Sequence, residues 1–585
     1  MMKRTHYCGD LRAKNIGESV SLTGWVWHWR DHGGVIFIDI RDRSGHSQLV
    51  FDPQENSDNH KQANELRSEF CIGITGKVRR RPEGTENPNM PTGEVEIVVD
   101  HLMIFSEAET PPFPIDEHVE VGEDVRLKYR YLDLRRPGLR NAILFRSRAA
   151  QLVRNYFSNH GFIEVETPVL SKSTPEGARD FLVPSRISPG DFFALPQSPQ
   201  IYKQLCMIAG LDRYFQIVKC FRDEDQRKDR QPEFTQIDVE MSFITPEDIY
   251  STMEGLIKTL WKELLDVEIE IPFPRLPYWD AMERYGIDRP DARFEMELRD
   301  IGDIGAESDF KVFRSIVEKG GKISGICVKG GAAFSRKEID DLTSEAAIFG
   351  AKGLAWMKVT DKGLESNIVK FFAEGLQQKL LERFNAEAGD LLLFVADEKE
   401  IVYAALAHLR VHIAERQNLF DPNDNKFLWV VDFPMFEKDD EGNPTPLHHP
   451  FTSPCTEDLD LLESDPLKIR SLAYDMVLNG IEIGGGSIRI HRRDVQSRVF
   501  KTLGIDEQKA QEKFGFLLDA FRYGAPPHGG IAFGFDRLIM LMLREPNIRE
   551  VIAFPKNQRA QAVLESAPSR VDEEQLRELG LRLRL

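Results

Sequence analysis

The sequence has few cysteines and no long apolar run, and each shortage excludes a class of protein. Six cysteines are scattered over 585 residues without a Cys-x-x-Cys pair, so neither a disulfide framework nor a zinc site is indicated. No apolar run approaches the roughly 20 residues that cross a bilayer. The first residues lack the apolar stretch of a signal peptide. We therefore expect a cytoplasmic protein with no membrane segment.

Two common nucleotide-binding motifs are also missing. The sequence has no Gly-x-x-x-x-Gly-Lys-Ser/Thr loop and no Gly-x-Gly-x-x-Gly after a strand, so any ATP must be held by side chains. The net charge of −19 argues against nucleic acid binding, because phosphate contacts need Lys and Arg. Residues 77–81 nevertheless form a local basic cluster, for which a solvated strand end is the alternative interpretation.

A chain of this length should form three or four domains. Residues 1–107 have the alternation of β-strands and a polar segment, 60–69, that predicts a short helix between the third and fourth strand. This layout is that of an OB-fold barrel, a fold that often binds single-stranded nucleic acid. A generic small barrel with Trp27 and Phe37 in its core is the alternative. The predicted strands are 19–29, 35–41, 47–51, 70–79 and 94–105.

The rest of the chain predicts an interrupted α+β domain after a stiff proline-containing linker, 108–138. An amphipathic helix over 141–160 ends at Gly161, and a short strand over 162–167 stops at Pro168. Strands are predicted at 214–221 and 234–243, where antiparallel pairing is plausible. Glycine-rich turns and few candidate catalytic residues indicate an inserted domain. The predicted segments are 139–289 and 421–585 for the catalytic domain and 290–420 for the insertion.

Residues 221–240 and 528–537 carry the strongest chemical signal. Each segment places an arginine beside acids and an apolar or glycine-rich strand. Arg222 and Arg537 could each pair with a phosphate through two donors. Phe234 could stack on adenine. This combination indicates an enzyme that uses ATP.

Other polar residues are ambiguous when each is taken alone. Glu482 and Asp475 could hold Mg²⁺ between phosphates, because hard cations prefer oxygen ligands. Arg489 alone is more often a strand-end arginine in a salt bridge than a ligand, and His448 could lie in a solvated loop. Residues 484–486 could form an ordinary turn or allow a ligand close to the backbone.

These motifs resemble the three signatures of class II aminoacyl-tRNA synthetases. The long helix with Pro168 resembles motif 1, which builds the dimer interface in that class, and the two arginine segments resemble motifs 2 and 3. The whole chain is similar to the bacterial-type aspartyl-tRNA synthetase family of subclass IIb, and its insertion resembles that family's GAD domain. The supporting strings are 173–178, 197–200 with Lys203, 448–452 and 484–489.

The resemblance implies a role for each matching position. Arg222, Glu224 and Arg537 are expected to be catalytic. Residues expected to bind ATP are Arg222, Asp223, Glu224, Gln231, Phe234, Glu482, Gly534, Phe535, Asp536 and Arg537. Residues expected to bind aspartate are Glu176, Ser198, Gln200, Lys203, Arg222, Asp238, His448 and Arg489. Asp475 and Glu482 are expected to bind Mg²⁺.

The implied activity is the ATP-dependent attachment of L-aspartate to tRNA through an aspartyl-adenylate. Lys203 and Arg489 would pair with the side-chain carboxylate of the substrate. Asparagine has nearly the same shape, but it would leave buried charge unpaired, which typically costs roughly 3–5 kcal/mol. The resemblance also implies a homodimer.

In the barrel, the resemblance implies contacts to the anticodon from Arg30, Phe37 and Gln48. Some enzymes of this family charge both tRNA(Asp) and tRNA(Asn), and an amidotransferase then converts the mischarged product. A histidine and a glycine in two barrel loops accompany this behaviour, and this chain has His32 and Gly84 there. We therefore predict a non-discriminating enzyme, with ordinary turn residues and a strictly discriminating enzyme as the alternative.

Three other functions compete with this prediction. An asparaginyl- or lysyl-tRNA synthetase fits poorly with the cations Arg489 and Lys203. A tRNA-independent aspartate-activating ligase should lack the barrel. A non-enzymatic nucleic-acid-binding protein would not need Arg222, Glu482 and Arg537 together, and would catalyse no exchange between ATP and pyrophosphate.

Overall fold

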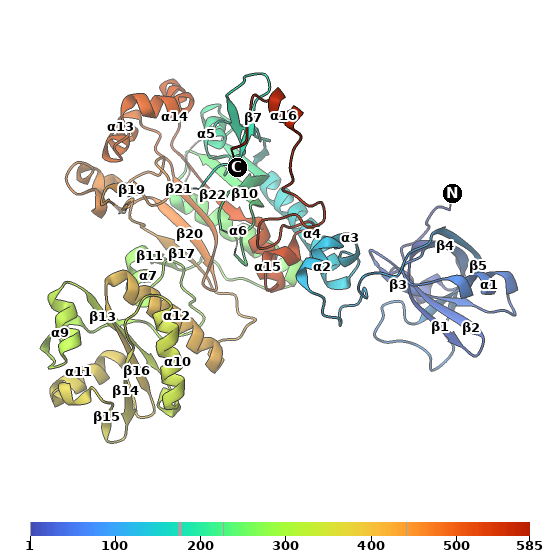
Figure 1. Ribbon diagram of the computed structural model, residues 1–585, viewed down its shortest axis with the longest axis horizontal. Coiled ribbons are helices and arrows are strands. Elements are labelled where there is room, and N and C mark those ends of the chain that lie inside the picture. Colours follow the sequence, from blue (N-terminus) through green and yellow to red (C-terminus); the bar gives the residue numbers. More distant parts are fainter. Residues whose placement is uncertain (1, 174–177, 226, 440, 585) are drawn as a thin grey trace. The chain divides into compact units, whose positions relative to one another are not determined.

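The computed structural model describes residues 2–173, 178–225, 227–439 and 441–584. Its first domain is a closed barrel with the strand order β1-β2-β3-β5-β4, drawn in blue in Figure 1. A helix, α1 (Ser57–Glu65), lies between the third and fourth strands as predicted, although it begins and ends earlier. The strands are β1 (Ser19–His32), β2 (Val35–Asp42), β3 (Gly45–Phe51), β4 (Cys71–Arg80) and β5 (Val95–Ser106).

Alternation along the strands decides which side chains fill the barrel. Ile36, Ile38 and Ile40 on β2 are fully buried in the core. Phe37 lies between them in sequence and therefore faces the other side of the strand, where it is half-buried. Neither Phe37 nor Trp27 belongs to the barrel core, so the alternative that placed both rings there is wrong.

The segment predicted as a stiff linker contains helices, α2 (Glu123–Lys128) and α3 (Arg130–Asp133). Arg130 is buried and donates to the backbone oxygens of Arg549, Ile552 and Ala553. By packing, residues 1–145 and 549–569 form one compact unit, and residues 146–548 and 570–584 lie in a second. The sequence of the linker does not predict this packing, because the residues that contact Arg130 lie near the other end of the chain.

An eight-stranded sheet forms the centre of the second unit, in the order β11-β17-β20-β21-β22-β10-β9-β6. Its inner strands are antiparallel, including the predicted pair β9 and β10, whereas β11–β17 and β6–β9 pair in parallel at the edges. The predicted strand over 162–167 is reduced to two residues, because it pairs only at its first positions. The strands are β6 (Ile163–Glu164), β9 (Arg213–Phe221), β10 (Glu233–Ser242), β11 (Arg275–Pro277), β17 (Phe427–Val431), β20 (Ala473–Leu478), β21 (Ile481–Ile488) and β22 (His528–Gly534).

Helices adjoining this sheet include the predicted long amphipathic helix, which begins four residues earlier than expected. None of the described helices combines the length and apolar content needed to cross a membrane. The helices of this part of the chain are α4 (Pro137–Asn159), α5 (Gln200–Ile208), α6 (Pro246–Leu265), α7 (Tyr278–Tyr285), α13 (Arg493–Thr502), α14 (Glu507–Ala520), α15 (Phe535–Leu543) and α16 (Glu573–Glu578). Two small hairpins join β7 (Leu182–Pro184) to β8 (Phe192–Ala194) and β18 (Phe436–Lys438) to β19 (Pro444–Pro446).

A second sheet, in the order β12-β13-β16-β14-β15, is inserted in the second unit between α7 and β17. Alternate residues of β16 point to opposite faces: Leu391 and Leu393 pack with α10 and α12, and Leu392 and Phe394 with α8, α9 and α11. The strands are β12 (Arg299–Asp300), β13 (Lys322–Val328), β14 (Ala355–Thr360), β15 (Gly363–Glu365) and β16 (Leu391–Asp397). The helices are α8 (Gly302–Glu307), α9 (Lys311–Glu318), α10 (Arg336–Ala347), α11 (Glu374–Phe384) and α12 (Lys399–Gln417).

Candidate active site

A cavity of about 530 Å³ opens over the eight-stranded sheet and is lined from β10, β20, β21, β22 and the loops beside them. Its walls bring together residues from 198 to 548 that are far apart in the sequence. The predicted residues that line it are Ser198, Gln200, Lys203, Arg222, Glu224, Gln231, Phe234, Asp238, His448, Asp475, Glu482, Arg489, Gly534, Asp536 and Arg537.

Two cations and two carboxylates form a buried quartet at one end of this cavity. Lys203 Nζ lies 2.6 Å from Asp238 Oδ1 and 3.3 Å from Glu240 Oε2. Arg489 donates from Nε and Nη2 to the two carboxylate oxygens of Glu240, at 3.0 and 3.2 Å. All four side chains are at most 2% exposed. The sequence predicted three of these residues but not Glu240, which pairs with both cations.

The four side chains of the quartet carry two positive and two negative charges, but one carboxylate oxygen accepts no hydrogen bond within the described part of the chain. Burial raises the pKa of Asp238 above its ordinary value, against the opposing charge of Lys203. Burial acts in the same direction on Glu240, but Arg489 and Lys203 outweigh it and hold the pKa of Glu240 below its ordinary value. Asp238 Oδ2 accepts no hydrogen bond from any described residue. A buried acceptor without a partner is costly, so this oxygen is suited to a donor on a ligand.

Two neighbouring histidines extend this end of the cavity. Burial and then the charge of Arg489 lower the pKa of His448 to about 4, and the same causes hold that of His449 well below its ordinary value. Arg489 Nη1 lies 2.9 Å from His449 Nε2 and donates to Ser487 Oγ at 2.6 Å. Both imidazoles are therefore neutral at pH 7, and they add polar groups without adding charge.

Arg222 and Phe234 lie side by side in the middle of the cavity. The guanidinium carbon of Arg222 lies 5.1 Å from the centre of the Phe234 ring, within the range of a cation–π contact. Arg222 Nε donates to no described residue. Glu224 pairs with Arg230 at 3.0 Å in the adjoining loop. The middle of the cavity thus offers an aromatic face and a cation with an available donor.

Arg537 lies on the first turn of α15 and is held at both ends of its guanidinium. Nη1 donates to the backbone oxygen of Glu482, and Nη2 to Asp229 Oδ2, each at 2.8 Å. Asp229 lies in the charged loop between β9 and β10 and is half-exposed. Arg537 Nε donates to no described residue and is available to an anion. An anion that also takes Nη2 would replace the ion pair with Asp229, which typically contributes only about 0–1 kcal/mol.

Asp475 and Glu482 bring two carboxylates together on the neighbouring strands β20 and β21. A Cβ atom on Gly485 would lie 2.6 Å from Asp475 Oδ1 and 3.4 Å from Glu482 Oε1, so glycine leaves the space that both carboxylates use. Burial, and then the charges of Glu482 and Asp288, raise the pKa of Asp475 well above its ordinary value. Such crowding of oxygen ligands and negative charge fits a hard divalent cation.

Of three further predicted ligands of ATP, two do not line the cavity, and the third, Asp536, lines it while also holding other parts of the fold. Asp223 is exposed and does not line the cavity. Phe535 is buried under Arg146, whose guanidinium carbon lies 4.7 Å from the ring centre. Asp536 accepts from the backbone N–H of Thr235 at 2.7 Å and pairs with Arg146, so both its oxygens join elements of the fold. Glu176 lies outside the described residues.

Several lining residues were not predicted from the sequence. They are Asp229, Gln236, Tyr278, Asp288, Phe433, His449 and Ser487. His449 and Ser487 stood inside strings that were recognised, and their contact with Arg489 required coordinates. Asp229 stood inside the recognised segment 221–240, where its contact with Arg537 required coordinates, and Asp288 stood outside every recognised string.

On the barrel, the predicted anticodon residues share the outer face of β1, β2 and β3. Arg30 is opposite Phe37, and Asp39 is opposite Gln48. Arg30 Nη2 donates to Asp39 Oδ1 at 2.9 Å and to Gln48 Oε1 at 3.3 Å. The result is a polar surface around one half-buried aromatic ring, a form that suits the stacking of an unpaired base.

The two loop positions lie at exposed turns. His32 is the exposed last residue of β1 and precedes a turn with two glycines. Gly84 has a φ of +82°, a conformation that side chains other than glycine rarely adopt, and no atom lies within 4 Å of a Cβ placed there. The positive φ explains why glycine stands at position 84. No contact among the described residues explains why histidine stands at position 32.

Comparison with known families agrees with this fold and this cavity. A family model described as tRNA synthetases class II (D, K and N) matches residues 122–558, and one described as OB-fold nucleic acid binding domain matches residues 20–105. The chain belongs to the class II tRNA synthetases of this D, K and N group. The predicted family and fold class are thereby confirmed.

Relatives of known name agree over their whole length. A protein of Caldanaerobacter subterraneus subsp. tengcongensis is 55% identical over 585 residues, covering 100% of this chain and 99% of the relative. One from Aquifex aeolicus is 56% identical, covering 99% of this chain and 98% of the relative. Both are named aspartate–tRNA(Asp/Asn) ligase.

Solved structures share the fold at much lower identity. An asparaginyl-tRNA synthetase from Pyrococcus horikoshii, complexed with asparaginyl-adenylate, has a TM-score of 0.59 and 20% identity, covering 95% of this chain and 98% of that chain. An aspartyl-tRNA synthetase from Entamoeba histolytica has a TM-score of 0.57 and 19% identity, covering 95% and 92%. These likenesses establish the fold alone.

Proposed function

We propose that this enzyme attaches L-aspartate to tRNA(Asp) and also to tRNA(Asn), through an aspartyl-adenylate made from ATP. The observation that carries the proposal is one cavity that joins the buried quartet to Arg222, Arg537 and the two clustered carboxylates. The full-length similarity to aspartate–tRNA(Asp/Asn) ligases supports it.

Charge balance in the quartet selects the amino acid. Asp238 Oδ2 receives the substrate ammonium, and Lys203 and Arg489 receive the side-chain carboxylate. The α-carboxylate, which aspartate and asparagine share, reacts with ATP outside this set. Within the set, aspartate adds one positive and one negative charge to four groups of zero net charge, so the buried set stays neutral. Asparagine adds only the ammonium, which leaves one uncompensated buried charge at a cost of roughly 3–5 kcal/mol.

The same cavity orients the nucleotide for in-line attack. Phe234 stacks on adenine, Gln231 and Glu224 hold the adenosine, and Arg222 and Arg537 neutralise phosphate oxygens. Asp475 and Glu482 would hold Mg²⁺, which would neutralise charge on the phosphates. A substrate α-carboxylate oxygen forms a bond to the α-phosphorus, the bond to the bridging oxygen breaks, and pyrophosphate leaves with the electron pair.

Transfer to tRNA follows on the same surface. A ribose hydroxyl at the tRNA end attacks the carbonyl carbon of the adenylate, an ester bond forms and AMP leaves. Both steps are direct transfers, so the protein contributes positioning and charge stabilisation rather than a covalent nucleophile.

The barrel selects the tRNA. We assign anticodon contact to Arg30, Phe37 and Gln48, with Phe37 stacking on the central base at a gain of about 1–3 kcal/mol. His32 and Gly84 accompany acceptance of both anticodons. The misacylated aspartyl-tRNA(Asn) requires an amidotransferase as a downstream partner, and we place the enzyme in the cytoplasm with these substrates.

The domain limits proposed from the sequence describe this division of labour. Residues 1–107 bind the anticodon, 108–138 form the hinge, and 139–289 with 421–585 form the catalytic domain around the inserted segment 290–420. These limits are functional, and they differ from the two packing units because residues 549–569 pack in the first unit.

Aminoacylation of purified tRNAs tests the proposal. We expect the enzyme to charge both tRNA(Asp) and tRNA(Asn) with labelled aspartate at comparable rates. His32→Leu should lower charging of tRNA(Asn) while leaving tRNA(Asp) nearly unchanged, and His101→Leu, an exposed control on the barrel, should change neither. A wild-type rate for tRNA(Asn) thousands-fold below that for tRNA(Asp) would show a discriminating enzyme.

A further inference from the structure

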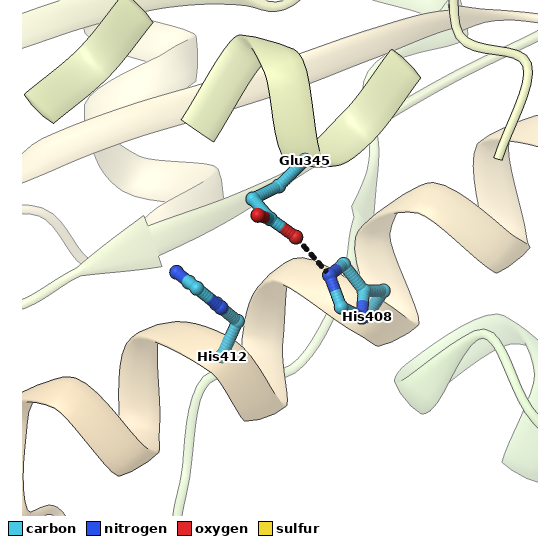
Figure 2. Close-up of side chains that lie close together, drawn as sticks. All are labelled: Glu345, His408 and His412. Carbon is cyan, nitrogen blue, oxygen red and sulfur yellow. Dashed lines mark hydrogen bonds and ion pairs between the residues drawn. The ribbon is translucent and has the colours of Figure 1, made fainter. Parts of the chain in front are cut away.

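Two helices of the inserted sheet domain hold three metal-ligating side chains close together. Glu345 lies near the end of α10, and His408 and His412 lie one turn apart on α12 (Figure 2). Their nearest ligand atoms all lie within 4.8 Å of one another. Among the described residues, no other group of three or more His, Cys, Asp or Glu side chains meets this criterion.

The spacing on α12 points both imidazoles the same way. Residues four apart lie one above the other on a helix, and the ring centres of His408 and His412 are 5.8 Å apart. His408 Nε2 lies 2.8 Å from Glu345 Oε2, and Figure 2 shows the Glu345 carboxylate directed at the space between the two rings. The three ligands thus converge from two separate helices.

The supporting helices are fixed by packing. The inner faces of α10 and α12 bury Ile339, Leu342, Leu409 and Ile413 in one core cluster. A second polar contact, between Glu338 and Arg416, joins the start of α10 to the end of α12. The two contacts, Glu338–Arg416 and Glu345–His408, together fix the antiparallel alignment of α10 and α12.

The chemistry of the three donors matches one class of metal ion. Two imidazoles and one carboxylate are ligands of Zn²⁺ and of its neighbours Co²⁺, Ni²⁺ and Cu²⁺, whereas Mg²⁺ and Ca²⁺ prefer oxygen. Tetrahedral Zn²⁺ with bonds of about 2.0–2.1 Å separates its ligand atoms by roughly 3.3 Å. The three ligand atoms already lie within 4.8 Å of one another, so a bound ion would draw them together by at most about 1.5 Å. The side chains of His408 and Glu345 are 31% and 32% exposed, so an ion can enter from solvent.

We propose that Glu345, His408 and His412 bind one divalent ion of the Zn²⁺ class, with water completing its coordination. The ion would replace the direct Glu345–His408 hydrogen bond and clamp α10 to α12. None of the three residues lines the active-site cavity, so this site is separate from the proposed Mg²⁺ site and independent of the proposed aminoacylation. Its role is the stability of the inserted domain.

Titration of the full-length, metal-free protein with CoCl₂, followed by displacement with ZnCl₂, tests the site. The visible absorption of Co²⁺ reports histidine coordination, and equilibrium dialysis counts the ions bound. We expect His412→Ala and Glu345→Gln each to remove one bound ion, or to weaken it by at least about tenfold. Zn²⁺ should raise the melting temperature of the wild type more than that of either variant.

Glu338→Gln is the matched control, because it removes the charge from the neighbouring contact between the same helices and leaves the three ligands intact. This variant should keep the ion and its absorption. His412→Asn serves as a second test if the alanine variant does not fold. Wild-type protein that gives no Co²⁺ spectrum, or variants that bind as many ions as the wild type with the same affinity, would overturn the proposal and leave the cluster as a helix-to-helix hydrogen bond.

Discussion

At the scale of single residues, Glu240 links the two cations of the proposed amino acid site. It accepts two hydrogen bonds from Arg489 and lies 3.3 Å from Lys203. From the sequence, we expected two unpaired cations, Lys203 and Arg489, to select the side-chain carboxylate of the substrate. The structure gives each cation a carboxylate already, so discrimination follows from the charge of the whole set rather than from unpaired cations.

Glu240→Gln should therefore damage the enzyme although its residue touches no substrate in this account. The change leaves the quartet with one uncompensated positive charge and frees Arg489 to reorient. Breaking such a buried pair costs about 3–5 kcal/mol of stability. ATP–pyrophosphate exchange should show a raised KM for aspartate, and thermal denaturation a lowered Tm. Glu247→Gln, which removes an exposed partner of Arg275, should change neither.

The low pKa of His448 predicts that the stability of the protein depends on pH. Its pKa of about 4 in the folded state is below the ordinary value of about 6.5, so the unfolded chain binds more protons between these values. Stability contributed by neutral His448 is therefore present above pH 6.5 and is lost as pH falls. For this one group the loss from pH 7 to pH 4 is about 3 kcal/mol.

Denaturant unfolding of the wild type and of His448→Gln at several pH values isolates this contribution. The difference in unfolding free energy between the two proteins should shift by about 3 kcal/mol against the wild type as pH falls. A difference independent of pH would mean that His448 titrates normally.

At the scale of elements, the glycines of β21 shape the cavity floor. Gly485 leaves room for Asp475, whose carboxylate oxygen would lie 2.6 Å from an added Cβ atom. Gly485→Ala should push that carboxylate aside without blocking the backbone. We expect a fold intact by circular dichroism and an aspartate-dependent ATP–pyrophosphate exchange that needs at least several-fold more Mg²⁺. An unchanged Mg²⁺ requirement would separate Asp475 from the metal.

Elements were predicted well where local pattern determines them. Alternation marked the barrel strands, and the charged loop marked the hairpin of β9 and β10. The helices of 123–133 were missed, because Arg130 is stabilised by backbone oxygens more than 400 residues away in sequence. The parallel partners of β6 and β11 were missed for the same reason.

The residues of the candidate site were likewise predicted only in part. Strings of residues identified most of the cavity wall, and they placed Arg222, Lys203 and Arg489 correctly within it. Phe535 stood in the same motif as Arg537 but packs against Arg146 outside the cavity wall, and Asp536 lines the cavity while pairing with Arg146. Sequence position alone could not separate a ligand-facing residue from its packed neighbours.

At the scale of the whole molecule, we predict a homodimer. Ile163, Val169 and Leu170 are 46–50% exposed in the segment that follows α4, where the family resemblance implies the interface. Light scattering should give twice 67.0 kDa for the wild type. Leu170→Asp should shift the mass toward the monomer, whereas Ile187→Asp, at an apolar residue exposed elsewhere, should not. A monomeric wild type would contradict this prediction.

The cavity as a whole is proposed to activate aspartate and to reject its neutral isostere. ATP–pyrophosphate exchange by the purified enzyme, measured with L-aspartate and with L-asparagine, tests this claim most directly. The uncompensated charge predicts exchange with aspartate and a kcat/KM for asparagine lower by a factor of at least about 150, from about 3–5 kcal/mol. Comparable exchange with both amino acids, or exchange with asparagine alone, would contradict the account.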